Sequence, residues 1–142
     1  MFSCCCIYYN TQRLNTYNSK TKLFSFEGKI KYAKVVKVYD GDTIQVVFKT
    51  QKEYYRFKCR LNRIDTPEIK SRNLSEKQKA IVCRDILKNI ILNKIVKVRC
   101  GKFDKYGRIL IELFYNNTNM NDWLIKKNYA VKYSGGTKQK WT

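Results

Sequence analysis

The stretch YAKVVKVYDGDTIQVVFKTQKEYYRFKCRLNRIDTPE, residues 32–68, decides the fold. Apolar and polar residues alternate along it in three runs, and a period of two places successive side chains on opposite faces of a β-strand. Asp40-Gly41 separates the first two runs, as a tight turn would, and Thr66-Pro67 stops the third. The stretch therefore predicts three consecutive strands. Their expected apolar faces carry Val36, Val38, Ile44, Val46, Phe48, Tyr55, Phe57, Cys59 and Leu61.

A helix, two more strands and a second helix are expected after these three strands. Ser75-Glu76-Lys77-Gln78 fits a capping box, and apolar residues then recur every three or four positions to about Leu92. Strand-like alternation returns over 96–100 and 109–114, and the last helix is expected over 121–127 with its first residue, an Asn, as N-cap. The order βββαββα fits an α+β class, a five-stranded oligonucleotide-binding (OB) barrel with helices.

The domain boundaries are predicted from where the periodic pattern begins and ends. Residues 1–31 are expected to form an N-terminal extension that is poorly ordered, residues 32–133 the barrel domain, and residues 134–142 a short basic tail. Two alternatives stay open for the tail. Its Gly-rich backbone with Lys138 and Lys140 could bind a phosphate, or the tail could fray.

The charge of the chain predicts a polyanionic partner. There are 30 Lys and Arg against 11 Asp and Glu, and the formal net charge is +19. The absence of His excludes imidazole bases and every His-containing zinc site. Any catalysis must therefore use carboxylates, Tyr, Lys, Arg, Cys or a metal ion.

The six cysteines contain no C-x-x-C pair and are expected to be reduced thiols, which favours an intracellular, reducing compartment such as the cytoplasm. No secretory signal is recognised at the N-terminus, no apolar run is long enough to span a membrane, and we expect a monomer. Cys4, Cys5 and Cys6 could be acylated and attach the protein peripherally to a membrane. The alternative is an ordinary, poorly ordered terminus.

Three acidic clusters interrupt the basic chain, at residues 40–43, 65–68 and 104–108, each next to the end of a predicted strand. Any one of them could be an ordinary turn. Together they suggest chemistry on a phosphodiester, because Asp42 and Asp65 are hard oxygen ligands that suit calcium or magnesium. In a chain without His, a carboxylate such as Glu68 would have to be the base.

Two arginines accompany these clusters. Arg60 lies five residues before Asp65, and Arg108 ends the third cluster. A guanidinium offers a planar fork to two phosphate oxygens, which Lys does not match. Either residue alone could be an ordinary surface arginine, but their place beside the carboxylates favours phosphate binding.

With these motifs the sequence resembles the thermonuclease, or staphylococcal-nuclease-like, family of phosphodiesterases. The resemblance covers about residues 34–132, and it is carried by V-Y-D-G-D-T at 38–43, R-x4-D-T-P-E at 60–68 and D-K-Y-G-R at 104–108. It implies the five-stranded barrel with flanking helices. Because the chain stops soon after residue 133, the last helix of the family is expected to be truncated or absent.

The resemblance also implies roles for the residues of these motifs. Asp42, Asp65 and the Thr66 carbonyl would ligate calcium, with magnesium possible in its place. Glu68 would be the general base.

The remaining roles concern the substrate and the surroundings of the metal. Arg60 would bind the scissile phosphate, and Arg108 would stabilise the transition state. Asp40 would lie close to the metal without ligating it. Lys105 and Tyr106 would contact the nucleotide, although Tyr106 could also simply pack at a turn.

These expectations describe a calcium-dependent endonuclease that hydrolyses DNA and RNA with low sequence specificity. The alternative is an OB barrel that binds nucleic acid without cutting it. A third reading, a basic protein attached to a membrane through its N-terminal cysteines, gives no reason for the acidic clusters.

Overall fold

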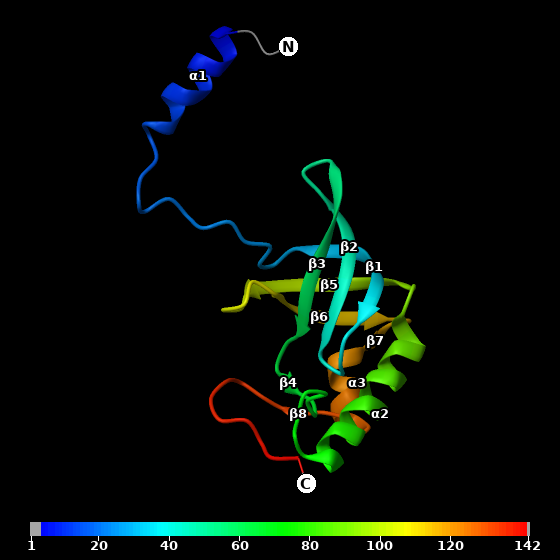
Figure 1. The fold of residues 1–142 in the computed structure, drawn as a ribbon. Coiled ribbons are helices and arrows are strands. Elements are labelled where there is room, and N and C mark those ends of the chain that lie inside the picture. The colour runs from blue at the N-terminus through cyan, green and yellow to red at the C-terminus, as the bar shows by residue number, and fades with distance from the viewer. Residues whose placement is uncertain (1–3, 142) are drawn as a thin grey trace.

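Three helices and eight strands make up the part of the chain that the structure, a computed structural model, describes, residues 4–141 (Figure 1). The helices are α1 (Cys4–Leu14), α2 (Leu74–Ile91) and α3 (Met120–Lys126). The strands are β1 (Ile30–Val38), β2 (Thr43–Thr50), β3 (Glu53–Leu61), β4 (Ile64–Asp65), β5 (Ile95–Phe103), β6 (Ile109–Tyr115), β7 (Thr118–Asn119) and β8 (Val131–Lys132).

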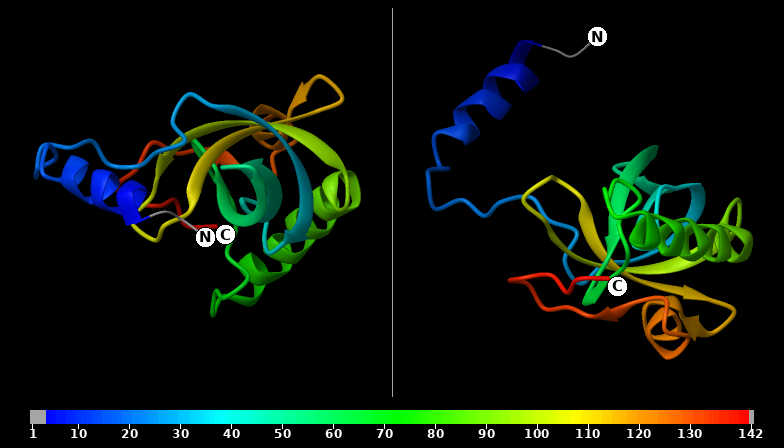
Figure 2. Two further views of the ribbon diagram at one scale, coloured as in Figure 1. Left: turned by 90° about the horizontal axis from the view of Figure 1, so that it is seen from above. Right: turned by 60° about the horizontal axis from the view of Figure 1, so that its bottom comes forward.

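The five long strands close into a barrel. Strand β1 pairs antiparallel with β2 and β5, β2 pairs with β3, and β5 pairs with β6. Parallel pairing of β3 with β6, with Cys59 opposite Ile109 and Leu61 opposite Ile111, completes the ring. In Figure 2 the strands curve around one common interior. This confirms the predicted α+β class and the five-stranded OB-type barrel.

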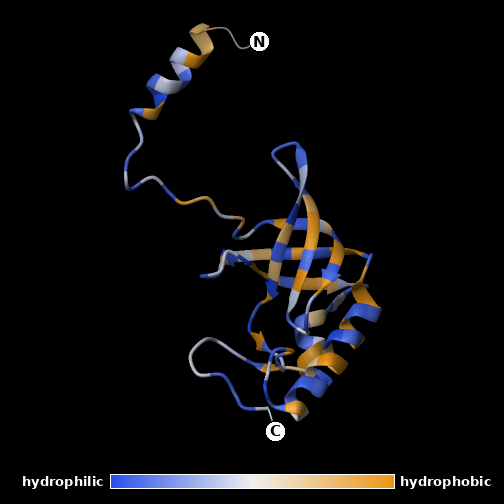
Figure 3. Ribbon diagram, in the orientation of Figure 1, coloured by the Kyte–Doolittle hydropathy of each residue, from blue (hydrophilic) through white to orange (hydrophobic). Residues whose placement is uncertain are grey.

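Apolar side chains from alternating positions are buried in the barrel. Figure 3 shows how hydrophobic and hydrophilic residues alternate along the strands. The Phe48 and Phe57 rings stack with their centroids 4.2 Å apart, and Phe26 meets both rings edge-on. Phe26 is 5% exposed and precedes β1. The core therefore begins before residue 32, where the alternating pattern begins, because a single buried aromatic residue leaves no periodic signal.

A β-bulge in β1 corrects the predicted inner face of that strand. The register with β2 shifts between Val35 and Lys37, so that Ala33, Val35 and Val38 are buried and Val36 is only partly buried. An extra residue at a bulge changes the face to which the following side chains point. Along β1 the simple period of two therefore mispredicts which Val enters the core.

The N-cap of helix α2 lies two residues before Ser75, where the capping box was predicted to begin. Asn73 is the N-cap, and its side-chain oxygen accepts a hydrogen bond from the Glu76 backbone N–H at 3.1 Å. The Glu76 carboxylate accepts from the Ser71 hydroxyl and from the Glu68 backbone N–H, so it joins the first turn of α2 to the loop before the helix. The predicted apolar stripe is confirmed, since Ala80, Cys83, Leu87 and Ile91 are buried.

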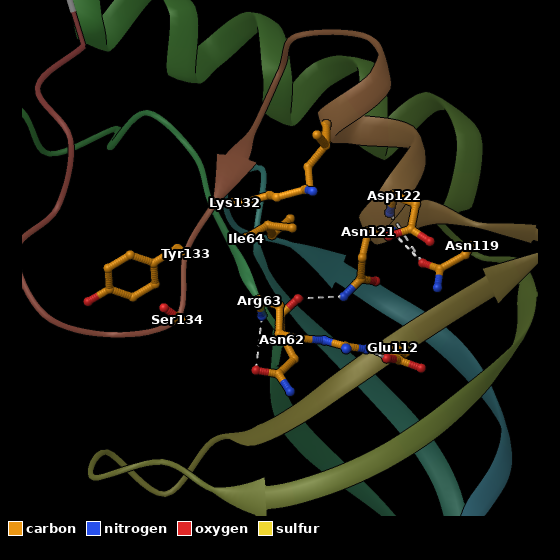
Figure 4. Close-up of a pocket in the computed structure, with 11 residues that line it drawn as sticks. Asn62, Arg63, Ile64, Glu112, Asn119, Asn121, Asp122, Lys132, Tyr133 and Ser134 are labelled. Atoms are coloured by element: carbon orange, nitrogen blue, oxygen red, sulfur yellow. Dashed lines mark hydrogen bonds and ion pairs between the residues drawn. The ribbon is translucent and has the colours of Figure 1, made fainter.

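Helix α3 also begins earlier than predicted, because Asn119 and not Asn121 is its N-cap. Asn121 is buried, and its side chain joins three segments instead. Its Oδ1 accepts from the Leu113 N–H at 3.1 Å, and its Nδ2 donates to the carbonyls of Asn62 and Ile111 at 3.0 Å each. Figure 4 shows the contact with Asn62. Asn121 therefore connects α3 to β6 and to the turn that leads into β4.

Replacing Asn121 with Ala is expected to lower the free energy of unfolding by about 2–5 kcal/mol, because the Leu113 N–H and the Asn62 carbonyl both lose a buried partner. Replacing the N-cap Asn119 with Ala should cost only about 1 kcal/mol. Urea unfolding of the two variants compares them directly. Equal losses of unfolding free energy in the two variants would show that Asn121 contributes no more to stability than a helix cap does.

The two ends of the chain differ in how they contact the barrel. Every residue of α1 is exposed, including Cys4, Cys5 and Cys6, whereas Cys59, Cys83 and Cys100 are buried, and all six are free thiols. Residues 127–141 contain no helix. Within residues 4–141, none of the helices combines the length and the apolar character needed to cross a membrane.

Candidate active site

The first two acidic clusters meet at one end of the barrel. Asp40 and Asp42 lie on the loop from β1 to β2, and Asp65 ends the short strand β4. The Leu61 N–H donates to the Asp42 carbonyl at 2.8 Å, which ties this loop to the end of β3. Asp42 and Asp65 are buried, at 6% and 2% exposure. Residues that lie 23 positions apart thus share one buried site.

Arg60 joins these two carboxylates. Its Nη2 lies 3.2 Å from Asp42 Oδ2 and 3.5 Å from Asp65 Oδ1. The guanidinium also lies 5.7 Å from the centroid of the Tyr133 ring. Two buried carboxylates therefore converge on one cation, which is the compensation that buried charges require.

The carboxyl group of Asp40 lies beside this pair. Its Oδ1 accepts from the Asp42 N–H at 3.1 Å. Burial raises the pKa of Asp40 to about 7, and the charge of Asp42 adds to the rise. At this end of the barrel, the neighbouring cations therefore do not stabilise every carboxyl group in its charged form.

Glu68 lies at the exposed rim of the same site. Its side chain is 55% exposed, and its Oε1 accepts from Lys138 Nζ at 2.8 Å. The same ammonium lies 3.2 Å from Asp65 Oδ1. Burial alone would lower the pKa of Lys138, but the hydrogen bond to Glu68 and the charge of Asp65 raise it, so that Lys138 stays charged.

The third cluster positions Arg108. The Nε of Arg108 donates to Asp104 Oδ2 at 2.7 Å, and its Nη1 donates to the Thr43 hydroxyl at 3.3 Å. Burial alone would raise the pKa of Asp104, but the hydrogen bonds from Arg108 lower it below its ordinary value. The Tyr106 ring is exposed, and it lies 5.4 Å from the Arg108 guanidinium and 5.1 Å from Lys105 Nζ.

Two connected hollows bring these residues together. A pocket of about 120 Å³ is lined by six of the predicted residues, namely Asp40, Asp42, Arg60, Thr66, Glu68 and Arg108. It adjoins a groove of about 870 Å³, which contains Lys58, Lys105 and Tyr106 and shares Arg60, Glu68, Arg108 and Lys138 with the pocket. The buried Asp65 lies behind the pocket and contacts it through Arg60 and Lys138. The structure thus brings all nine predicted residues to one end of the barrel.

A further pocket of about 530 Å³ lies beside this groove and shares Asn62, Arg63, Tyr133 and Ser134 with it (Figure 4). Arg63 pairs with Glu112 there, and Asn121 uses its side chain to hold the wall together. This pocket therefore borders the groove but contains none of the predicted site residues.

The oxygen atoms of this site are of the kind that a hard divalent cation prefers, but the acidic side chains are not arranged around a common centre. Asp42, Asp65 and the Thr66 carbonyl offer the oxygen ligands that calcium and magnesium prefer. Within residues 4–141, however, no three acidic or cysteine side chains lie close enough together to hold a metal. Two protein cations, Arg60 and Lys138, stand among the carboxylates instead. The carboxylates therefore attract cations. A metal ion bound to them would have to replace contacts that Arg60 and Lys138 now make.

Position 41 requires Gly because there is no room for a side chain, and not because of the backbone conformation of the turn. The loop between β1 and β2 has four residues, and a Cβ on Gly41 would lie 2.3 Å from Cys83 Sγ and 3.0 Å from Thr66 Cγ2. Cys83 belongs to α2 and is buried, and burial raises the pKa of its thiol to about 12. The close approach of the loop to α2 thus fixes the acidic loop against Thr66.

Replacing Gly41 with Ala is therefore expected to cost about 1–3 kcal/mol of folding free energy through overpacking. It should also displace Thr66. Adding Cys83→Ala should restore part of the loss, because the closest atom is removed. Thermal unfolding of the two single variants and the double variant forms the test. A double variant whose losses simply add would contradict this packing account.

Tyr133 and the packing role of Gly41 were not predicted from the sequence, and Lys138 was considered only as a possible phosphate contact and not as a partner of the carboxylates. Lys138 lies 70 positions from Glu68, and nothing in the spacing of the motifs signals that contact. Tyr133 follows β8, whose pairing with β4 places it over Arg60. Only the tertiary fold reveals these neighbours.

The fold and the site together define a class: an OB-type barrel with a carboxylate–arginine pocket at one end that opens into a basic groove. The family described as staphylococcal nuclease homologues matches residues 58–141, from β3 through the C-terminal segment. The chain belongs to this family. The loop with Asp40 and Asp42 lies before the matched range.

Individual relatives agree with this family. The chain is 36% identical over 101 residues to an uncharacterized endonuclease of Haemophilus influenzae, with 70% of this chain and 51% of that protein covered. It is 30% identical over 103 residues to an uncharacterized endonuclease of Escherichia coli, with coverage of 72% and 61%. It is 33% identical over 126 residues to the uncharacterized protein MJ1439 of Methanocaldococcus jannaschii, with coverage of 72% and 59%. The match thus spans between half and two thirds of these relatives' lengths.

Proposed function

We propose that this chain is a metal-dependent endonuclease, with calcium as its metal, that hydrolyses phosphodiester bonds of DNA and RNA with low sequence specificity. The single observation that carries the proposal is the convergence of Asp42, Asp65 and Glu68 with Arg60 and Arg108 beside one basic groove. Carboxylates and guanidiniums around one phosphate are what a hydrolytic site without His needs.

Asp42, Asp65 and the Thr66 carbonyl would hold the calcium ion, which when bound supplies Lewis-acid stabilisation to a phosphate oxygen. Glu68 is the proposed base. It removes a proton from the water that attacks phosphorus, because its exposed carboxylate stands at the rim where substrate enters.

The two arginines are proposed to bind the charge that develops on phosphorus. Arg60 lines the floor of the pocket, and Arg108 is oriented by Asp104 and the Thr43 hydroxyl. Fixed donors of this kind stabilise the transition state without having to reorganise.

The groove is proposed to hold the rest of the substrate. Lys58 and Lys105 would contact phosphates, and Tyr106 is exposed for contact with a base or sugar. Phosphate contacts carry no information on base sequence, so low specificity follows. The net charge of +19 would attract the polyanion to this groove.

The rival function is a nucleic-acid-binding barrel that does not cut. The experiment that separates the two incubates purified protein with single-stranded DNA, double-stranded DNA and RNA, in calcium, magnesium or excess chelator. Binding of the same nucleic acids is measured in parallel in chelator.

Cleavage in calcium that stops with chelator is the expected result. Cleavage in magnesium alone would keep the nuclease and change its metal. Tight binding without cleavage under any condition would favour the rival.

A further inference from the structure

The C-terminal segment Tyr133–Trp141 lines one side of the proposed active site, because four of its residues line the groove and Lys138 also lines the small pocket. It enters through β8, which pairs with β4, and the Tyr133 N–H donates to the Arg63 carbonyl at 3.0 Å. The Tyr133 hydroxyl donates to the Gly136 carbonyl at 2.9 Å. Gly135 and Gly136 have φ values of +105° and +86°, which glycine adopts readily, and the segment turns back toward the start of α2 (Figure 1).

The far end of the segment lies near the loop that carries the proposed base. Trp141 lines a pocket of about 410 Å³ together with Pro67, Cys83 and Tyr129. Pro67 lies between Thr66 and Glu68. Lys138 thus belongs to a segment that bonds to Arg63 at its start and ends beside the Thr66–Glu68 loop.

The Lys138 ammonium stands where the acidic residues would receive a cation. It lies 2.8 Å from Glu68 Oε1 and 3.2 Å from Asp65 Oδ1, and the Asp65 side chain is only 2% exposed. Calcium binds carboxylate oxygens at about 2.3–2.6 Å. A divalent ion on Asp65 Oδ1 would repel an ammonium on the same atom, so the two are mutually exclusive there.

We propose that Lys138 is an internal competitor for the divalent cation: it holds Asp65 and Glu68 in the metal-free protein and withdraws when the metal binds. The inference rests on the proposed function, because it takes Asp65 as a metal ligand. It is carried by the two ion pairs that Lys138 makes with Asp65 and Glu68.

The groove provides the place to which Lys138 withdraws. Lys138 lines both the small pocket and the groove, where Ser134, Gly135 and Tyr106 are its neighbours along the wall. Its side chain is 45% exposed and free to turn outward. Until it does, its ammonium occupies the Glu68 carboxylate oxygen that would have to face the attacking water. The contact therefore blocks the proposed base while divalent metal is scarce.

The expected size of the effect follows from a simple population argument. If Lys138 occupies the carboxylates about 90% of the time, only a tenth of the molecules are ready for metal, and the apparent affinity falls about tenfold. A much larger effect is not expected, because a half-exposed ion pair is weak.

The test is calcium titration of the full chain by isothermal titration calorimetry, without nucleic acid. Lys138→Gln should bind calcium about tenfold more tightly than the unmodified protein. Lys140→Gln is the matched control, because it removes the same charge from an exposed position two residues away and should change the affinity by less than about twofold. Lys138→Arg keeps the charge and should stay close to the unmodified protein.

Three outcomes would overturn the inference in different ways. Equal calcium affinity of Lys138→Gln and the unmodified protein would show that Lys138 does not compete with calcium. The proposed nuclease function would be unaffected by that result. An equal gain in calcium affinity for Lys140→Gln would show that the effect comes from the net charge of the protein and not from the position of Lys138. If no variant binds calcium or magnesium, the metal assignment fails, and this inference fails with it. Unchanged thermal unfolding of the variants would show that folding does not account for the difference.

Discussion

Replacing Glu68 with Gln is expected to lower kcat by about 10²–10⁴-fold, because the amide cannot take a proton from the attacking water. The side chain is 55% exposed and makes no core contact, so the variant should fold normally. Nucleic-acid affinity should change little, since the arginines and lysines that bind phosphate remain in place. Steady-state cleavage rates and binding isotherms measure the two quantities separately.

Glu53→Gln is the matched control for this experiment. Glu53 is also exposed, but it starts β3 at the hairpin end remote from β4 (Figure 1), so its variant should keep the full rate. Full turnover of this variant would remove Glu68 from the proposed role.

Replacing Arg108 with Ala is expected to lower kcat by about 10²–10³-fold, the usual cost of removing one preorganised donor to a transition state. The loss should fall on kcat more than on KM, because the proposed contact strengthens as charge develops. Arg108→Lys should recover little of the rate, because an ammonium cannot reproduce the fork held by Asp104 and Thr43.

Arg99→Ala serves as the comparison. Arg99 is 57% exposed on β5 and pairs with Glu112, away from the pocket residues. Its removal takes away the same charge and should change kcat by less than about twofold. An equal loss in both variants would point to the overall field of the protein and not to a specific role of Arg108.

The fold was largely predictable because its signals are local. Alternation over β2, β3, β5 and β6 and the apolar stripe of α2 require only neighbouring residues, and these elements lie where they were predicted, although Tyr55 of β3, expected on the apolar face, is exposed. The errors fell where tertiary contacts override local preference. Asn73 and not Ser75 is the N-cap of α2, and Asn121 binds three segments rather than capping α3.

The candidate site was predictable in its members but not in its arrangement. The motifs single out Asp42, Asp65 and Arg60 by residue type and spacing, and a likeness to a family supplies their expected roles. Their distances do not follow from spacing, because they depend on how β3 closes against β6 and on the bond that ties the Asp42 loop to Leu61.

By itself, the sequence of this protein determined the strands, the main helix, the basic character and the residues able to carry phosphodiester chemistry, since these depend on composition and short-range periodicity. Only the tertiary structure decided that Gly41 must lack a side chain, that Tyr133 lies over Arg60 and that Lys138 pairs with Asp65 and Glu68. Such contacts join positions up to 73 residues apart, and only the closure of the barrel and the pairing of β4 with β8 bring them together.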